Sequence, residues 1–414
     1  MKVSSIVRHM DTNQRISLTI LVAALGYFVD VFDLQLFAIL RVNSLKSLGL
    51  SPEQITSTGA MLINWQMAGF LAGGILWGVL GDKKGRVSTL FGTILLYSLG
   101  NIANAFVTTI PAYAAARFFT GMGLAGEVGV GITLLSELLP KEKRCYATTV
   151  MIGIGVLGPV VASIVADALD WRTAYIAGGV LGLLLLTLRI AVCESGLFNT
   201  LHKKKEVKCG SFFMLFNNKK RFFKYLCCIG IGIPNWFVAG VLLVFSPEIG
   251  VALGSNEPLK VSHAVITYST GLAIGCFTTG LLSQLFKNRK KIIGFFIAGL
   301  LFSDFAALSW YGITANSFYA VICVCGFFMG YWTLFMTTTA EQFGTNLRST
   351  ATTTTANFVR GSLILDMVLV NFLKPDFGFL KSLIITALVG GAIAAVALWK
   401  LPETFNKDLD FVEK

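Results

Sequence analysis

The stretch Gly26-Tyr-Phe-Val-Asp30-Val-Phe-Asp33-Leu-Gln-Leu-Phe37 lies within an apolar run that extends from about residue 16 to residue 40. This run exceeds the roughly 20 residues that a helix needs to cross a bilayer, so it is predicted to span a membrane. Asp30 and Asp33 lie three residues apart at its centre, which places both carboxylates on one face of the helix. A charge at this depth costs about 2.5–3.5 kcal/mol and usually faces water or a partner charge. We therefore expect a proton or substrate site here, and the alternative is a structural pair with a basic residue.

The composition of the whole chain is that of a membrane protein. Of its 414 residues, 55% are hydrophobic and only 14% are charged, whereas soluble domains carry about 25% charged residues. The first apolar run is too long for the core of a signal peptide, and no small-residue cleavage site follows it, so we expect it to remain as the first span. The net charge of +12 is spread over loops and not gathered on one basic domain. It therefore does not indicate binding to nucleic acid.

Hydrophobic runs separated by polar breaks predict twelve spans. They cover approximately residues 16–40, 53–80, 87–107, 111–136, 145–168, 172–194, 224–249, 263–286, 292–313, 317–340, 351–373 and 379–400. Lysines and arginines gather in alternate loops and at both termini, which the positive-inside rule places in the cytoplasm. We expect a six-helix bundle over residues 1–194, a cytoplasmic linker over 195–223 and a second bundle over 224–414. The expected protein is a monomer in the inner membrane of the cell.

The eight cysteines and three histidines show neither a disulfide framework nor the spacing of metal ligands. No nucleophile–base pair and no nucleotide-binding loop stands out in the sequence. We therefore expect neither an enzyme nor a bound metal or cofactor.

A charged turn follows the second predicted span. Its sequence, Gly78-Val-Leu-Gly-Asp82-Lys-Lys-Gly85-Arg86, combines glycines with charged residues, which is typical of a tight hairpin. The Asp82 carboxylate can accept hydrogen bonds from the N-terminus of a neighbouring helix and can pair with Arg86. Such a contact would hold one conformation of the protein shut on the cytoplasmic side.

The same turn resembles a family signature. Gly78-x-x-x-Asp82-x-x-Gly85-Arg86 is similar to the loop 2–3 motif of the major facilitator superfamily, and further similar segments run along the chain. These are Arg117-Phe-Phe-Thr-Gly-Met-Gly-Leu-Ala-Gly-Glu127, Ser136-Glu137-Leu-Leu-Pro140 with Arg144, Asp170-Trp171-Arg172, Glu194-Ser-Gly-Leu-Phe198, Glu341-Gln-Phe-Gly-Thr-Asn-Leu-Arg348 and Pro402-Glu403-Thr404. The resemblance implies an all-α membrane protein with two six-helix bundles around a central cavity, working by alternating access. It also implies a conformational latch made by Gly78, Asp82, Gly85, Arg86, Glu137, Arg144, Glu341 and Arg348.

One branch of that family is more similar than the others. Gly26-x-x-x-Asp30-x-x-Asp33 together with Glu127 resembles the metabolite:proton symporters of the sugar-porter-like branch, which move small carboxylates, betaines and related metabolites. The chain departs from the pattern, because that group commonly has Glu-Trp-Tyr-Asp where Asp30-Val-Phe-Asp33 stands here. Residues 285–291 also lack the Gly-Asp-Gly-Arg pattern that internal symmetry predicts. The resemblance therefore implies transport but leaves the substrate open.

Charged residues within the predicted spans are the candidates for the transport site. Arg117 and Arg360 carry donors suited to a carboxylate, so each is expected either to bind an anionic substrate or to form a structural ion pair with Glu127, Asp30 or Asp304. For proton coupling, the candidates are the three carboxylates Asp30, Asp33 and Glu127, because access to water changes their affinity for a proton. Polar and aromatic side chains expected to contact substrate are Gln35, Asn64, Asn235, Trp236, Asn357 and Tyr331.

These observations predict a proton-coupled symporter that takes up a small organic anion such as a carboxylate metabolite. The alternative is a proton-driven antiporter that exports a drug-like compound or a siderophore, since Gly158-Pro159 partly resembles the helix 5 motif of drug:proton antiporters. The expected partners are protons, a small-molecule substrate and the lipid bilayer.

Overall fold

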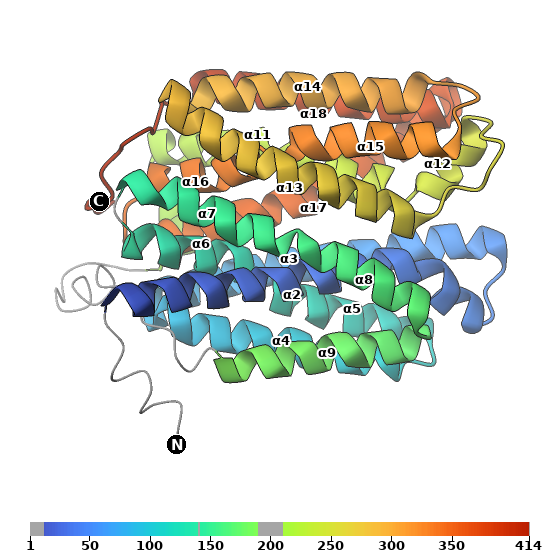
Figure 1. The fold of residues 1–414 in the computed structure, drawn as a ribbon, viewed down its shortest axis with the longest axis horizontal. Coiled ribbons are helices and arrows are strands. Elements are labelled where there is room, and N and C mark those ends of the chain that lie inside the picture. The colour runs from blue at the N-terminus through green and yellow to red at the C-terminus, as the bar shows by residue number, and fades with distance from the viewer. Residues whose placement is uncertain (1–11, 140, 189–209, 414) are drawn as a thin grey trace.

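Long helices that run along one axis make up the described part of the chain, which is residues 12–139, 141–188 and 210–413 of the computed structural model (Figure 1). These residues contain no strand. Eleven helical stretches among them are long and apolar enough to cross a membrane, and α4 (Arg86–Ala105) is a twelfth helix of comparable length. The predicted all-helical membrane fold is therefore confirmed.

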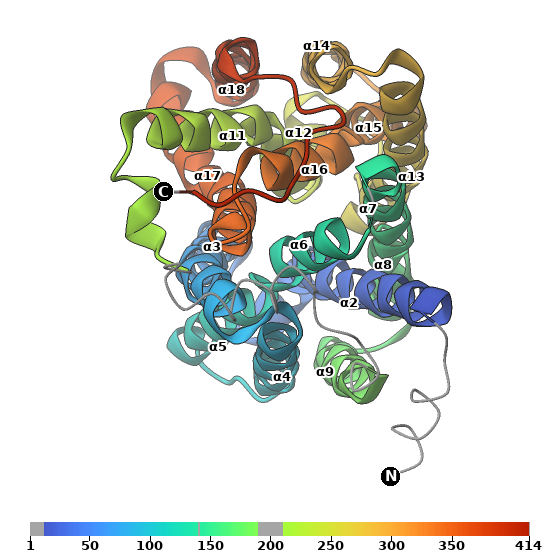
Figure 2. The ribbon, with the colours of Figure 1, turned by 90° about the vertical axis from the view of Figure 1, so that its left-hand side faces the viewer.

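The helices form two groups that face each other across an interface (Figure 2). The first half contains α2 (Thr12–Ser47), α3 (Pro52–Lys84), α4, α5 (Ile110–Leu124), α6 (Glu127–Leu138), α7 (Lys141–Gly155), α8 (Leu157–Ala168) and α9 (Trp171–Leu188). The second half contains α11 (Lys219–Phe237), η3 (Val238–Leu242), α12 (Ser246–Ala252), α13 (Val261–Phe286), α14 (Arg289–Ser309), α15 (Ala315–Met329), α16 (Trp332–Gln342), α17 (Arg348–Phe377) and α18 (Phe379–Lys400), preceded by the short helix η2 (Phe212–Leu215).

Four of the predicted spans are interrupted, whereas the hydrophobic pattern predicted continuous helices. The interruptions lie between α5 and α6, between α7 and α8, between α15 and α16, and after α11, where the chain widens into the π-helix η3 before α12. Pro234 lies inside α11 and cannot donate a hydrogen bond to the preceding turn, which accounts for the distortion that follows it. Gly330 separates α15 from α16 and packs so closely on α13 that a Cβ atom there would lie 2.2 Å from the Gly275 carbonyl carbon.

The two halves touch most closely where α3 crosses α17. A Cβ atom at Gly78 would lie 3.0 Å from the Cα atom of Thr350, so the two backbones meet without an intervening side chain. A second contact between the halves is made by α13 against α7 and α8. Small residues at such crossings let helices approach in lipid, where hydrophobic burial alone gives little preference for one helix partner over another.

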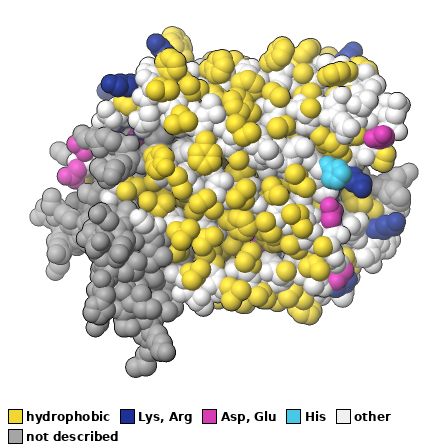
Figure 3. All heavy atoms as spheres, in the orientation of Figure 1, with side chains coloured by type: hydrophobic (Ala, Val, Ile, Leu, Met, Phe, Trp, Pro, Cys, Tyr) yellow, Lys and Arg dark blue, Asp and Glu magenta, His cyan; other side chains and the backbone are white. Residues whose placement is uncertain are grey.

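The outer surface of the molecule is suited to a bilayer. Figure 3 shows one face on which hydrophobic side chains cover the long middle part, while charged side chains gather near the two ends. We call the end that holds Asp82 and the C-terminal segment the latch end, and the opposite end, which holds the α2–α3 turn, the far end. Figure 2 views the molecule from the latch end, where the C-terminal segment passes beside α16.

Candidate functional site

A buried ion pair joins the two halves near the middle of the interface. Asp30 on α2 accepts a hydrogen bond from Nη2 of Arg360 on α17 at 3.1 Å, and both side chains are almost completely buried. The guanidinium group also lies over the ring of Phe70 on α3, at 4.6 Å, and over that of Trp236 on α11, at 5.6 Å from the ring centroid. Cation–π contacts of this kind stabilise a desolvated guanidinium. Helices of both halves therefore surround a single pair of charges.

This ion pair leaves hydrogen-bonding groups unused. Nε and Nη1 of Arg360 and Oδ1 of Asp30 have no hydrogen-bond partner among the residues that the structure describes. Buried polar atoms in folded proteins are nearly always satisfied by protein or by water. These unsatisfied atoms therefore mark the place where water, protons or a ligand would bind.

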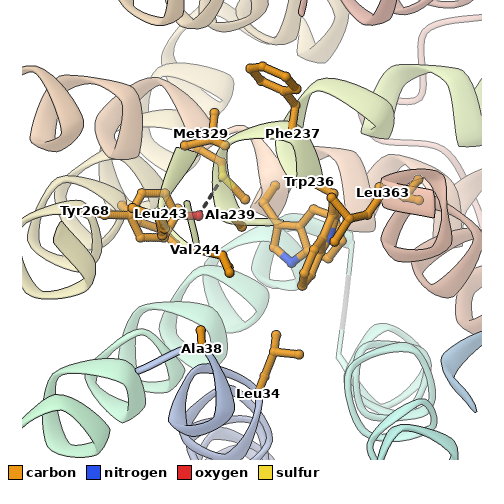
Figure 4. Packing of buried hydrophobic residues seen from close by; sticks show 14 of the residues in the cluster. Leu34, Ala38, Trp236, Phe237, Ala239, Leu243, Val244, Tyr268, Met329 and Leu363 are labelled. Atoms are coloured by element: carbon orange, nitrogen blue, oxygen red, sulfur yellow. Dashed lines mark hydrogen bonds between the residues drawn. The ribbon is translucent and has the colours of Figure 1, made fainter. Parts of the chain in front are cut away.

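A small cavity of about 30 Å³ lies beside Trp236 at the same interface. Gln35 and Gln66 of the first half and Trp236 of the second half line it, among apolar residues that include Leu34, Ala38, Val244 and Leu363. In Figure 4, Leu34 and Ala38 on α2 lie across from Trp236 and Val244. Nε2 of Gln66 and Nε1 of Trp236 have no hydrogen-bond partner in the described part of the chain. The cavity holds no more than a water molecule or two, so the centre is nearly closed in this conformation.

Two more charged side chains, those of Asp33 and Arg117, are buried within the first half. Asp33 is one helical turn from Asp30, and neither of its oxygens has a hydrogen-bond partner in the described residues. Oδ1 of Asp33 lies so close to α9 that a Cβ atom at Gly178 would be 2.6 Å from it. Arg117 on α5 lies over the ring of Phe37 at 4.5 Å, and its three nitrogens are also without a hydrogen-bond partner among the described residues.

The other predicted site residues fall into different places. Glu127, the first residue of α6, accepts a hydrogen bond from Oγ1 of Thr93 at 3.2 Å, which is a contact within the first half. Asn64 lines a larger cavity at the far end. Asn235 is buried, and neither atom of its amide has a partner among the residues described.

Two of the predicted substrate contacts bind backbone in this conformation. Asn357 on α17 donates from Nδ2 to the carbonyl oxygens of Ala125, at 2.6 Å, and Thr353, at 2.7 Å, and so ties α17 to the end of α5. Tyr331 donates to the carbonyl oxygen of Ile231 at 3.0 Å within the second half.

Asp82 lies at the N-terminus of a helix from the other half. Its Oδ2 accepts hydrogen bonds from the backbone nitrogen of Thr350 at 2.8 Å and from Oγ1 of the same residue at 2.6 Å, and its Oδ1 accepts from the nitrogen of Ser349 at 3.2 Å. The negative charge faces the positive end of the α17 dipole. Gly85, with φ of +102°, makes the sharp turn between α3 and α4 that brings Arg86 back to 3.2 Å from Asp82.

Glu137 on α6 connects three parts of the latch end. Its Oε1 lies 2.9 Å from Nη2 of Arg86 and 3.0 Å from Nη1 of Arg348, so one carboxylate forms ion pairs with arginines of both halves. Arg348 also donates to the carbonyl oxygen of Leu409 at 2.7 Å, which brings the C-terminal segment into the same network. The side chain of Arg144 lies outside the described residues.

Sequence reasoning missed two charged contacts. Glu341, predicted as part of the latch, forms a buried pair with Arg289 at 2.9 Å inside the second half. Arg289 begins α14 as Arg86 begins α4, so its position at the start of a helix could have identified it. Arg41 at the far end pairs with Glu248 on α12 at 3.0 Å and donates to the Val244 carbonyl oxygen at 3.2 Å. Both residues lie near predicted loops, and no spacing rule connects them.

Known membrane transporters are similar to this chain in sequence and in fold. A family model described as Major Facilitator Superfamily matches residues 23–365. The niacin transporter NiaP of Acinetobacter baylyi is 24% identical in an alignment that covers 94% of this chain and 95% of that protein. The sialic acid transporter NanX of Escherichia coli is 24% identical over 383 residues, covering 90% of each chain. The structure of the proton:xylose symporter XylE superposes with a TM-score of 0.75 at 20% identity, over 97% of this chain and 98% of that one.

Proposed function

We propose that this chain takes up a small organic anion together with protons. It belongs to the major facilitator superfamily, and it is a multi-pass membrane transporter of small molecules, not an enzyme. The bundles of residues 1–194 and 224–414 would rock about the interface around a site near the bilayer midplane, as in other transporters of this kind. We further propose that the protein is a monomer in the inner membrane with its latch end in the cytoplasm, which agrees with the excess of lysine and arginine at that side.

The observation that carries this proposal is the Asp30–Arg360 pair between the halves. When Asp30 takes up a proton, it no longer neutralises Arg360, and the guanidinium can offer its fork of donors to the carboxylate of a substrate. The unused nitrogens of Arg360 and the unpaired donors of Gln66 and Trp236 would then surround an anion.

The same ion pair explains why proton transport and substrate transport would be coupled. A protonated Asp30 without substrate leaves Arg360 buried and unpaired, and a bound anion beside an ionised Asp30 gives one excess negative charge. Either state leaves an uncompensated charge in a desolvated site, which costs several kcal/mol. Only the protein with both a proton and an anion bound, and the protein with neither bound, are electrically balanced at this site. These two forms would therefore change between the two conformations most readily.

The nature of the substrate rests on charge and on the relatives. A buried arginine with free donors favours a carboxylate over a neutral solute. The relatives named for niacin and for sialic acid are named after carboxylic acids, and XylE is named as a proton symporter. Asp33, beside α9, is the second candidate for the proton, and Glu127 is the third.

Transport by the purified chain in sealed liposomes tests the proposal. With nicotinate as probe, acid outside the liposomes should drive accumulation, a protonophore should abolish it, and Arg360→Gln should remove it. Export of nicotinate driven by external acid would support the antiporter instead. Accumulation of nicotinate that does not depend on the pH gradient would contradict proton coupling.

A further inference from the structure

A cavity of about 620 Å³ opens between the two halves at the far end. One wall is a face of α3 that includes Ser57, Met61 and Asn64, and the opposite wall is a face of α17 that includes Met367, Asn371 and Lys374. The floor is formed by η3 and α12. The volume falls within the range of roughly 300–1,000 Å³ that small-molecule sites occupy. The cavity exists because α3 and α17 touch near Gly78 and diverge toward the far end.

The lining of this far-end cavity is amphipathic and carries one cation without a partner. Met61, Val241, Phe245 and Leu383 give it apolar walls. Glu248 also lines it but is already paired with Arg41. Lys374 forms no ion pair with any residue that the structure describes, and its Nζ lies 5.5 Å from the centre of the Phe379 ring. The unpaired charge at this mouth is therefore positive.

Only one layer of chain separates the far-end cavity from the small central cavity. Val241 and Phe245 line the first, while their neighbours Gly240 and Val244 line the second, so η3 and the residues after it form the partition. On α3, Asn64 lines the far-end cavity and its neighbour Ile63 lines the central one. Gly240 packs against Leu363, whose side chain lies near Trp236 in Figure 4. The partition contains a π-helix, an element that often marks a functional site within a helix.

We propose that the far-end cavity is an antechamber in which an anionic, mainly apolar substrate such as an aromatic carboxylate binds before it reaches Arg360. Lys374 holds the carboxylate at the mouth, the apolar walls receive the ring, and displacement of η3 admits the molecule to the centre. This inference rests on the proposed function, because it takes the same class of substrate.

Protection of an introduced thiol tests the antechamber directly. Ser57→Cys places a thiol on the cavity wall, and Ser47→Cys is the matched control. Both serines are exposed at the far end. Each hydroxyl donates a hydrogen bond to the carbonyl oxygen three residues earlier, at 3.2 Å for Ser57 and 2.8 Å for Ser47. The neutral reagent methyl methanethiosulfonate modifies both, and its rate on the parent chain is subtracted. Nicotinate should slow modification of Ser57→Cys severalfold and leave Ser47→Cys unchanged.

The same measurement in an Arg360→Gln background separates the antechamber from the central site. Protection of Ser57→Cys should persist there, and adding Lys374→Gln should raise the nicotinate concentration for half protection by about fivefold, the effect of an exposed charge pair. Lys381→Gln, at the same end but outside the cavity, should not change it. If Arg360→Gln does not fold, Asp30→Asn/Arg360→Gln, which removes both charges, takes its place.

Several results would overturn the antechamber. The antechamber is refuted if Arg360→Gln abolishes protection. It is also refuted if Lys374→Gln leaves protection unchanged, as a lipid chain filling the cavity would produce. In either case, proton-driven accumulation of nicotinate by the parent would still support the proposed function. Failure of the parent to accumulate nicotinate refutes the proposed function in this form, and the antechamber with it.

Discussion

The two ends of the interface between the halves are closed by different means. At the latch end, Asp82 caps the first turn of α17 through three hydrogen bonds, and Glu137 forms ion pairs with both Arg86 and Arg348. At the far end, among the described residues, the charged contact between the halves is Arg41 with Glu248, whose side chain is 27% exposed, beside the open antechamber. Fully buried, charge-assisted contacts are stronger than partly exposed ones. The buried charged contacts between the halves therefore gather at the latch end, and we expect the interface to open more easily at the far end.

The largest effect should come from Glu137→Gln. This change leaves Arg86 and Arg348 adjacent without their shared carboxylate, and breaking a buried ion pair costs about 3–5 kcal/mol. The equilibrium should shift toward a form open at the latch end. Spin labels on the exposed residues Lys84 and Lys287 would report a longer distance, while labels on Ser47 and Lys381 at the far end would report a shorter one.

Glu341→Gln is the matched control for Glu137→Gln. Glu341 is equally buried and also pairs with an arginine, but Arg289 belongs to the same half. The control should lower the melting temperature without moving either pair of spin labels. Equal shifts in the two variants would show that the latch end has no special role in closing the interface.

Asp82→Asn should have an intermediate effect. The amide keeps the shape of the side chain but loses the charge, and hydrogen bonds to a charged group are worth about 1.5–3 kcal/mol. Opening at the latch end should follow, measured with the same labels. Asp170 provides the comparison, because in the described part of the chain its carboxylate accepts hydrogen bonds from Arg172 and Thr173 of its own helix α9. Asp170→Asn should therefore leave the label distances unchanged, and a shift as large as that of Asp82→Asn would contradict the assignment.

Glu248→Gln should act in the opposite direction and more weakly. Arg41 is buried, but water reaches the Glu248 side chain, which is 27% exposed, and a glutamine there can still accept the Arg41 hydrogen bond, so we expect a smaller cost than at Glu137. The far-end labels should move apart slightly, and the latch-end labels should not. Glu257→Gln, an exposed carboxylate at the same end, is the control, and equal responses from the two variants would remove Arg41–Glu248 from the far-end closure.

The smallest effect concerns acid and the Asp170 cap. The hydroxyl and backbone N–H of Thr173 donate to Asp170 and lower its pKa from the usual 3.8. A lowered pKa in the folded state means that the cap stabilises fully above the unfolded-state pKa and is lost as pH falls through the folded-state value. Melting temperatures measured across that acid range should fall more steeply for the parent chain than for Asp170→Asn. Parallel curves would show that the cap contributes nothing.

The sequence was sufficient for features that depend on local pattern. Hydropathy predicted the membrane helices, and the turn that contains Asp82 predicted a carboxylate at a neighbouring helix N-terminus. It left open whether Arg360 pairs with Asp30 or with a substrate, because these residues lie 330 positions apart and meet only when the two halves pack. The breaks at Gly126 and Gly330 could not be predicted either. Gly126 packs against the side chains of Thr93 and Trp77 and Gly330 against the backbone of Gly275, and only the folded chain brings these groups together.

The most direct test of the exchange at Arg360 is the number of protons taken up when nicotinate binds to the purified protein, measured with a pH indicator in weakly buffered solution. The parent should take up a proton with each nicotinate, and Asp30→Asn, which cannot be ionised, should bind nicotinate without taking one up. Proton uptake that is absent in the parent, or unchanged in Asp30→Asn, would contradict the exchange of Asp30 for substrate on Arg360.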